Sequence, residues 1–149
     1  MLIHTASFEL TTKGFSDCKD ITATLQQCLS ESSIVDGLLI AMNPGSTGAI
    51  TTIEYESGAV SDLQNALERI APIGIEYAHN LRWGDGNGFS HVRSALMKPS
   101  LAIPVVGGKL CLGTWQQVVF LDFDNRPRKR KLVVQIMGRG GREGYREEF

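Results

Sequence analysis

Residues 101–137 read LAIPVVGGKLCLGTWQQVVFLDFDNRPRKRKLVVQIM, and this stretch decides the fold class. It contains four apolar or alternating runs of strand length, separated by short segments that include a Gly-Gly and an Asp-Asn pair. Strands joined by short turns pair antiparallel, whereas parallel strands need a long crossover connection. The stretch therefore predicts an antiparallel arrangement of strands over residues 101–106, 110–115, 118–123 and 131–137.

The N-terminal part adds further strands and short helices. Strand patterns cover residues 3–11, 37–42 and 49–53, and the polar turn between the last two is expected to close a hairpin. Because helices and strands do not alternate regularly, we expect an α+β fold, an antiparallel β-sandwich with a few short helices, rather than a doubly wound sheet.

Three helices are expected from apolar residues at helical spacing. The first lies around residues 21–29, with Asp17 or Asp20 as its cap, and the third covers residues 90–97. The second begins at Ser61 and ends before Pro72.

Composition indicates one globular domain over residues 1–149, of which residues 139–149 are expected to be an extended or frayed tail. Hydrophobic residues make up 42% of the chain and charged residues 21%, which excludes a disordered or collagen-like protein. Three cysteines without a Cys-x-x-Cys pair indicate reduced thiols, buried in the case of Cys28 and Cys111. With no signal-peptide pattern and no apolar run long enough for a membrane span, we expect a cytoplasmic protein that does not interact with membranes.

The net charge of −1 hides an asymmetry: residues 1–125 carry −6 and residues 126–149 carry +5. Five of the six residues from Arg126 to Lys131 are basic. This run is interpreted either as a phosphate or nucleic-acid patch or as an exposed turn that leads into the last strand with alternate charges facing solvent. No aromatic residues are interleaved with these charges, which disfavours nucleic acid as a partner.

A glycine-rich loop carries two of the three histidines, in the sequence His79-Asn-Leu-Arg-Trp-Gly-Asp85-Gly-Asn87-Gly-Phe-Ser-His91. Two imidazoles and a carboxylate could bind a divalent metal, hold a phosphate, or move a proton near neutral pH. The spacing is not that of a tight metal motif, so structural histidines beside a turn are the alternative.

Three further groups of residues are candidates for ligand contact. Ser46 and Thr47 lie in a turn that could hold a phosphate but lacks the lysine of a P-loop, and they could instead satisfy their own backbone. Glu54 is either a general base or an exposed strand-end charge. Gln116 could contact a ligand, beside a Trp115 that is expected in the core.

An ordered series of motifs resembles the YjbQ-like family, long known as an uncharacterised protein family. The resemblance extends over about residues 8–138. It rests on Gly45-Ser46-Thr47 with residues 51–54, Tyr77-x-His79, Asp85-Gly86-Asn87 before His91, residues 100–105, Gly108-x-Leu110, Leu112-Gly113-Thr114-Trp115-Gln116 and Arg126-x-Arg128-x-Arg130.

The resemblance implies an α+β sandwich that assembles as a homotrimer with sites near subunit contacts. It also implies a secondary thiamine-phosphate synthase activity, a weak or side activity that joins hydroxymethylpyrimidine diphosphate to a thiazole phosphate and releases diphosphate. The family's polar cluster corresponds to Glu54, His79, Asp85, Asn87, His91, Gln116 and Arg128. Many members have a His-Thr-Thr-Ala or His-Ser-Thr-Ala run where this chain has Gly45-Ser46-Thr47-Gly48, so an imidazole is absent at position 45.

The leading hypothesis is therefore a trimeric transferase for small phosphorylated substrates. His79, His91 and Asp85 would bind Zn²⁺ or Mg²⁺, or the diphosphate directly, with Glu54 as base or orienting group. Ser46, Thr47, Asn87 and Gln116 would contact the ligand, and Arg128 and Arg130 its phosphate. The alternatives are a non-catalytic ligand- or metal-binding trimer and, third, RNA binding through the basic end.

Overall fold

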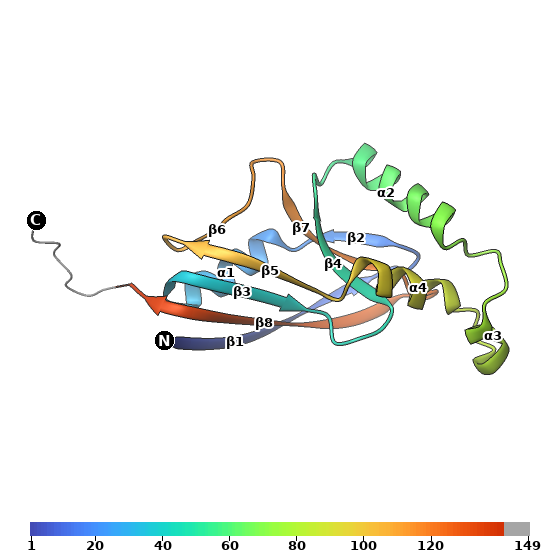
Figure 1. Cartoon of the computed structure of the whole chain (residues 1–149), viewed down its shortest axis with the longest axis horizontal. Helices are drawn as coiled ribbons and strands as arrows, with labels where there is room; N and C mark the ends of the chain where they lie inside the picture. Colours follow the sequence, from blue (N-terminus) through green and yellow to red (C-terminus); the bar gives the residue numbers. More distant parts are fainter. Residues whose placement is uncertain (142–149) are drawn as a thin grey trace, which may run out of the picture.

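The computed structural model describes residues 1–141. Its strands and helices do not alternate regularly along the chain (Figure 1). The strands are β1 (Leu2–Thr12), β2 (Asp17–Asp20), β3 (Ile34–Met42), β4 (Gly48–Ile53), β5 (Ser100–Val106), β6 (Lys109–Leu110), β7 (Gln117–Asp122) and β8 (Arg128–Gly140). The helices are α1 (Thr22–Ser32), α2 (Ser57–Ile70), α3 (Ala78–Trp83) and α4 (Gly88–Met97).

The strands form two sheets, one in the order β1-β8-β3-β5-β6 and the other in the order β2-β7-β4. Each neighbouring pair of these strands runs antiparallel. The 13-residue strand β8 pairs with β1 on one side and with β3 on the other. The prediction of an antiparallel α+β fold with few helices is confirmed.

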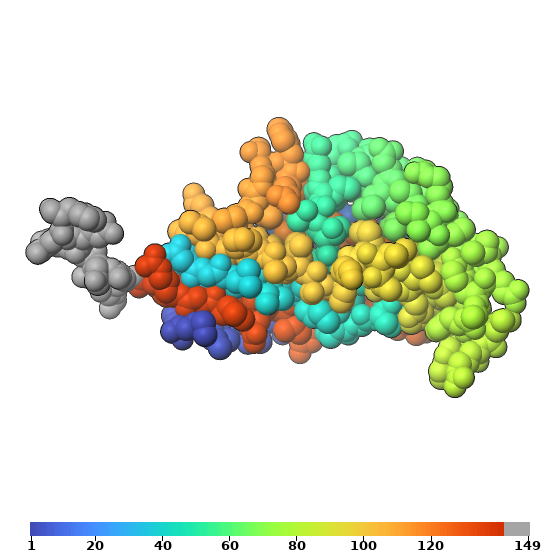
Figure 2. Space-filling model, viewed as in Figure 1, coloured from blue at the N-terminus to red at the C-terminus, as the bar shows by residue number. Residues whose placement is uncertain are grey.

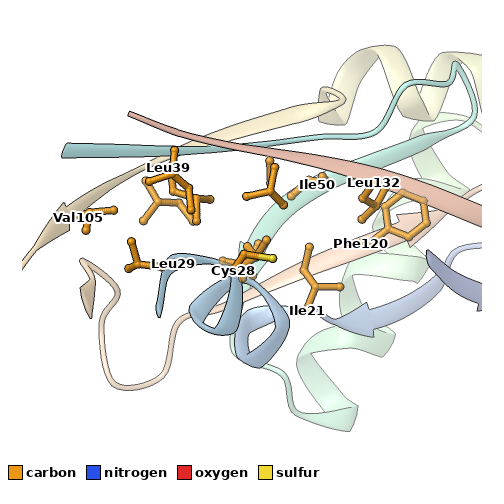
Figure 3. Close-up of a cluster of buried hydrophobic side chains, with 14 of the residues drawn as sticks. Ile21, Cys28, Leu29, Leu39, Ile50, Val105, Phe120 and Leu132 are labelled. Carbon is orange, nitrogen blue, oxygen red and sulfur yellow. The ribbon is translucent and has the colours of Figure 1, made fainter. Parts of the chain in front are cut away.

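The main core lies between the two sheets and includes the buried face of α1. Leu25, Cys28 and Leu29 of α1 pack there with apolar residues of β3, β5, β7 and β8 (Figure 3). A second cluster on the other face of β7 lies under α2, where Leu67 is buried. Both faces of β7 are therefore covered, which explains why residues 118–123 form a continuous apolar run instead of an alternating one.

The predicted helices are present, but the boundary of α2 differs from the expectation. It begins at Ser57, not Ser61, because the Glu56 carboxylate accepts hydrogen bonds from the amides of Gly58 and Ala59 at 2.7 and 2.8 Å. Asp20 makes the expected contact at the start of α1, since its Oδ1 accepts from the Thr22 amide at 2.9 Å. The short elements β2 and α3 were not predicted.

Two predicted strand features are wrong. The turn after β3 does not close a hairpin, because β3 and β4 belong to different sheets and the turn crosses between them. Of the strand expected over residues 110–115, only β6 is present, at Lys109–Leu110.

The loop between β6 and β7 projects from the body beside the start of α2 (Figures 1 and 2). Trp115 in this loop is 72% exposed, so its prediction as a core residue is wrong. Cys111 is exposed, contrary to expectation, whereas Cys28 is buried as predicted.

The start of the expected C-terminal tail is the end of β8. Arg139 lies in this strand, and its Nη2 is 2.6 Å from Oδ2 of Asp36. The remaining tail residues, 142–149, lie outside the described part of the chain. Within residues 1–141, no helix has the length and apolar character needed to cross a membrane.

Candidate functional site

The two loop histidines come together at one end of the molecule. His79 lies on α3 and His91 on α4, and the two helices are joined by a turn in which Gly84 and Gly86 adopt φ of +64° and +65°. These left-handed conformations favour glycine and allow the chain to reverse within a few residues. As a result, the imidazole centroids are 4.3 Å apart, with the rings tilted by 38°.

Asp85 lies in the same turn and faces His79. Its Oδ1 is 3.3 Å from Nδ1 of His79, and it also accepts a hydrogen bond from the Asn87 amide at 3.2 Å. The buried Nδ1 has no well-directed hydrogen bond within residues 1–141, so the Asp85 carboxylate is the polar group that orients this ring. A carboxylate beside Nδ1 leaves Nε2 as the nitrogen available to a ligand.

His91 is partly buried. Burial lowers its pKa, and the neighbouring His79 lowers it further, while the negative charges of Asp85 and Asp124 act in the opposite direction. His91 is therefore a neutral imidazole near pH 7, the form that accepts a proton.

Asn87 fixes the turn to the body of the protein. Its side chain is buried, and its Oδ1 accepts hydrogen bonds from Ser90 Oγ at 2.6 Å and from the Asn125 amide at 3.2 Å. In addition, Asn125 Nδ2 donates to the Asp85 carbonyl at 2.8 Å. These contacts join the histidine turn to the turn between β7 and β8, so Asn87 acts on the site through positioning.

Two buried aspartates, Asp122 at the end of β7 and Asp124 in this neighbouring turn, were missed from the sequence. Asp124 is 1% exposed, and its Oδ2 accepts from Thr47 Oγ1 at 3.1 Å and from Arg128 Nη2 at 3.0 Å. Burial alone would raise the pKa of Asp124, but the hydrogen bonds from Arg128 and Thr47 outweigh it and lower the pKa. In the sequence, Asp124-Asn125 is typical of a surface turn, and nothing in it indicates burial.

Asp122 holds the second arginine of the basic run. The two oxygens of this fully buried carboxylate accept from Nε and Nη2 of Arg130 at 2.7 and 2.8 Å, a bidentate ion pair. Thr12 Oγ1 also donates to it, at 2.6 Å. The hydrogen bond to Asp122 raises the pKa of Arg130, so the guanidinium is a permanent partner of the buried acid.

The basic run is therefore divided between the two sides of β8. Arg128 and Arg130 face the aspartates, whereas Lys129 and Lys131 are exposed on the alternate side. Only part of the run is free to contact a phosphate of another molecule, which weakens the RNA hypothesis. Of Arg128 and Arg130, Arg128 is the more accessible, with 35% of its side chain exposed.

The remaining predicted site residues lie at the other end of β4. Thr47 precedes this strand and Glu54 follows it, and six residues of extended chain span about 20 Å. Gln116 Nε2 donates to Thr52 Oγ1 at 3.1 Å, which places it near the Glu54 end, where Glu54 is exposed. One copy of the chain thus brings together His79, His91, Asp85 and Asn87, but not Glu54 or Gln116.

The described part of the chain contains no cluster of three or more His, Cys, Asp or Glu side chains arranged to hold a metal ion. His79, His91 and Asp85 are close to one another, but Asp85 is directed at a histidine nitrogen. The arrangement fits an imidazole pair oriented by a carboxylate better than a preformed metal centre.

Comparison with known proteins agrees with this fold. A curated UPF0047 protein of Methanothermobacter thermautotrophicus is 35% identical over 139 residues, which cover 93% of this chain and 95% of that protein. One from Archaeoglobus fulgidus is 36% identical over 118 residues, or 79% of this chain and 89% of that protein.

Solved structures are similar as well. A protein of unknown function from Sulfolobus solfataricus superposes with a TM-score of 0.88 at 26% identity, covering 93% of this chain and 99% of that one. A hypothetical protein from Aeropyrum pernix gives a TM-score of 0.85 at 32% identity, with coverage of 91% and 99%. The family model described as UPF0047 protein YjbQ-like matches residues 6–139. The chain therefore belongs to the YjbQ-like UPF0047 family.

Proposed function

We propose that this chain is a transferase for small phosphorylated substrates, similar to the secondary thiamine-phosphate synthases that the family resemblance implies. The observation that carries the proposal is the packing of His91 against His79, whose Nδ1 faces the Asp85 carboxylate at 3.3 Å. Two imidazoles in different environments beside a carboxylate are suited to proton transfer near neutral pH.

In the proposed reaction, a thiazole nitrogen bonds to the methylene carbon of hydroxymethylpyrimidine diphosphate as the carbon–oxygen bond to diphosphate breaks. The electron pair leaves with the diphosphate, so stabilising its oxygens is the main electrostatic requirement. Carrying protons on both nitrogens, with Nδ1–H directed at the Asp85 carboxylate, His79 would donate from Nε2 to the leaving group, and Asp85 would keep the ring oriented. The attacking thiazole nitrogen carries no proton to be removed, so neutral His91 would accept a hydrogen bond that orients the substrate. Ser46, exposed beside Thr47, and Arg128 would contact a phosphate at the edge of this cluster.

A homotrimer is part of this proposal. Glu54 and Gln116 are separated from the histidines within one chain, so a neighbouring copy would have to supply them to complete the predicted polar site. Large apolar side chains are exposed near both ends, with Trp115 at 72%, Leu81 at 73% and Trp83 at 67%. Such exposed side chains support a subunit contact, which would remove them from water.

The test is turnover of the two thiamine precursors by purified protein whose trimeric state has been checked by light scattering. His79→Ala should reduce kcat by about 10²-fold or more, the range for losing a general acid, and His91→Ala should also reduce it by removing the group that orients the substrate. His4→Ala is the matched control, because His4 lies on β1, away from α3 and α4 (Figure 1). Turnover that is absent in the trimeric wild type, or equal in all three variants, would refute the assignment.

The alternative is a non-catalytic ligand- or metal-binding trimer. It is favoured by the engagement of Arg128 and Arg130 with aspartates, which leaves less positive charge for a diphosphate than the sequence alone implies. Binding of Zn²⁺ or Mg²⁺ by His79, His91 and Asp85 stays a prediction, as does a cytoplasmic location. Metal analysis of wild type and of a His79→Ala, His91→Ala double variant separates the two functions, since bound metal without turnover would support the alternative.

A further inference from the structure

A hollow of about 440 Å³ lies beside the loop between β6 and β7, where this loop faces the end of β4 and the start of α2. Its lining includes three carboxylates, those of Asp20, Glu54 and Glu56, and neither a lysine nor an arginine. Tyr55 and Trp115 add two aromatic rings to the walls. Because both carboxylates and aromatic faces attract cations, the hollow is suited to a cationic group that is carried on apolar surface.

Part of the negative charge in this hollow has no partner. Both oxygens of Glu56 accept hydrogen bonds from amides at the start of α2. Glu54, by contrast, is exposed and takes part in none of the ion pairs within residues 1–141. The two aromatic side chains are accessible as well, with Tyr55 46% and Trp115 72% exposed. The hollow therefore offers an unneutralised carboxylate next to uncovered aromatic surface.

Helix α3 carries the complementary groups. Leu81 and Trp83 are 73% and 67% exposed, and Arg82 between them is also exposed. The guanidinium carbon of Arg82 lies 5.7 Å from the centroid of the Trp83 ring, so this cation is carried on an aromatic surface. In the part of the chain that the structure describes, no ion pair includes Arg82. The helix thus presents a cation without a counter-charge between two large apolar side chains.

Helix α2 keeps these two surfaces apart within one chain. The hollow lies at the start of α2, whereas α3 follows its end, and 14 helical residues span about 21 Å (Figure 1). Contact between the two surfaces therefore requires two copies of the chain. Since the surfaces differ, the contact is head-to-tail, and repeating it around an axis closes a ring in which every copy uses both surfaces.

We propose that α3 of one copy docks in the hollow of the next copy, with Arg82 facing Glu54 and Trp83 packing against Trp115. The inference rests on the proposed function and names the subunit contact of its homotrimer. His79 and Arg82 are three residues apart on α3, so they lie on one side of the helix with Cβ atoms about 5–6 Å apart. Docking of Arg82 beside Glu54 therefore brings the far end of β4 to the histidines, which lack it within one copy.

Sedimentation velocity over a dilution series of the purified chain measures this assembly. Arg82→Glu juxtaposes like charges and should raise the dissociation constant about 100-fold or more. Trp115→Ala removes an aromatic anchor and should raise it about 30-fold or more. Adding Glu54→Arg to Arg82→Glu should restore most of the assembly, because the charges are then exchanged. Lys131→Glu is the matched control and should assemble like the wild type, since Lys131 is exposed on β8, outside both surfaces.

Intrinsic fluorescence gives a second readout, because Trp83 and Trp115 are the only two tryptophans of the chain. Both are exposed in a single copy and would leave water in the contact. Their emission should therefore shift to longer wavelength as the wild type dissociates on dilution. Arg82→Glu should show the long-wavelength emission already at concentrations at which the wild type is assembled.

A wild type that stays monomeric at all concentrations would overturn the proposal and assign the hollow to another occupant. Assembly and emission that are the same in Arg82→Glu and Trp115→Ala as in the wild type would overturn it too, as would a charge-exchanged double variant that assembles no better than Arg82→Glu. Circular dichroism checks that each variant is folded.

The result is separable from turnover. Assembly that Arg82→Glu disrupts, in a protein without synthase activity, keeps the subunit contact and removes the transferase. Turnover by a wild type whose assembly neither Arg82→Glu nor Trp115→Ala disturbs does the reverse.

Discussion

Replacing Arg130 with methionine should destabilise the protein far more than the same change at the adjacent Lys129. Arg130 makes two hydrogen bonds of 2.7 and 2.8 Å to Asp122, which is 0% exposed, and a third to Thr47. Removing one partner of a buried ion pair leaves the other charge uncompensated and costs about 3–5 kcal/mol. Lys129, by contrast, pairs with Glu9 where both side chains are more than half exposed, and such pairs contribute about 0–1 kcal/mol.

Urea unfolding at matched protein concentration measures the difference. With a slope of about 2 kcal/mol/M, Arg130→Met should lower the midpoint by about 2 M and Lys129→Met by less than about 0.5 M. Equal protein concentrations are needed because subunit association would add to the apparent stability. Similar midpoints for the two variants would refute the division of the basic run into a buried and an exposed side.

Two further predictions concern local interactions. Glu56→Ala should lower the urea-unfolding midpoint by removing the cap of α2. Glu54→Ala, two residues earlier and exposed, should leave the midpoint nearly unchanged, and equal losses would contradict the capping role. Burial and the nearby His79 lower the pKa of His91 in the folded protein. The unfolded chain therefore binds more protons at this residue than the folded protein does. The contribution of His91 to stability is present above about pH 6.5 and is lost as the pH falls through its pKa in the folded state. The wild type should therefore lose more stability than His91→Gln between pH 7 and pH 5, and parallel thermal-melting curves for the two would contradict this.

Periodicity predicted strands such as β1, in which one face is more buried than the other, whereas β7, covered on both faces, was recognised as a continuous apolar run. Strand β1 alternates between exposed and partly buried residues, as its sequence suggests. The start of α2 was missed because Glu is not among the preferred capping residues, although the Glu56 carboxylate does bond two amides. Strand β2 and helix α3, with four and six residues, are too short to show a period.

The candidate site was predictable only in part, for a similar reason. The histidine turn is local, so its glycines and Asp85 identified it in the sequence as a candidate site, while the close approach of the two imidazoles is seen only in the structure. Asp122 and Asp124 are buried through contacts with residues distant in the sequence, such as Thr12 and Thr47, which no local pattern indicates. The hairpin expected between β3 and β4 failed in the same way, since turn residues specify a reversal of the chain but not the sheet that the next strand joins.

Basic residues of the C-terminal segment form ion pairs with acidic residues of the rest of the chain. Each of four basic residues of β8 forms an ion pair with an acid from the acidic part of the chain: Arg128 with Asp124, Lys129 with Glu9, Arg130 with Asp122, and Arg139 with Asp36. Two of these pairs are buried or partly buried and link β8 to the end of β7, beside the histidine turn. A basic segment that serves as the internal counter-charge of two buried aspartates needs no nucleic acid to explain it.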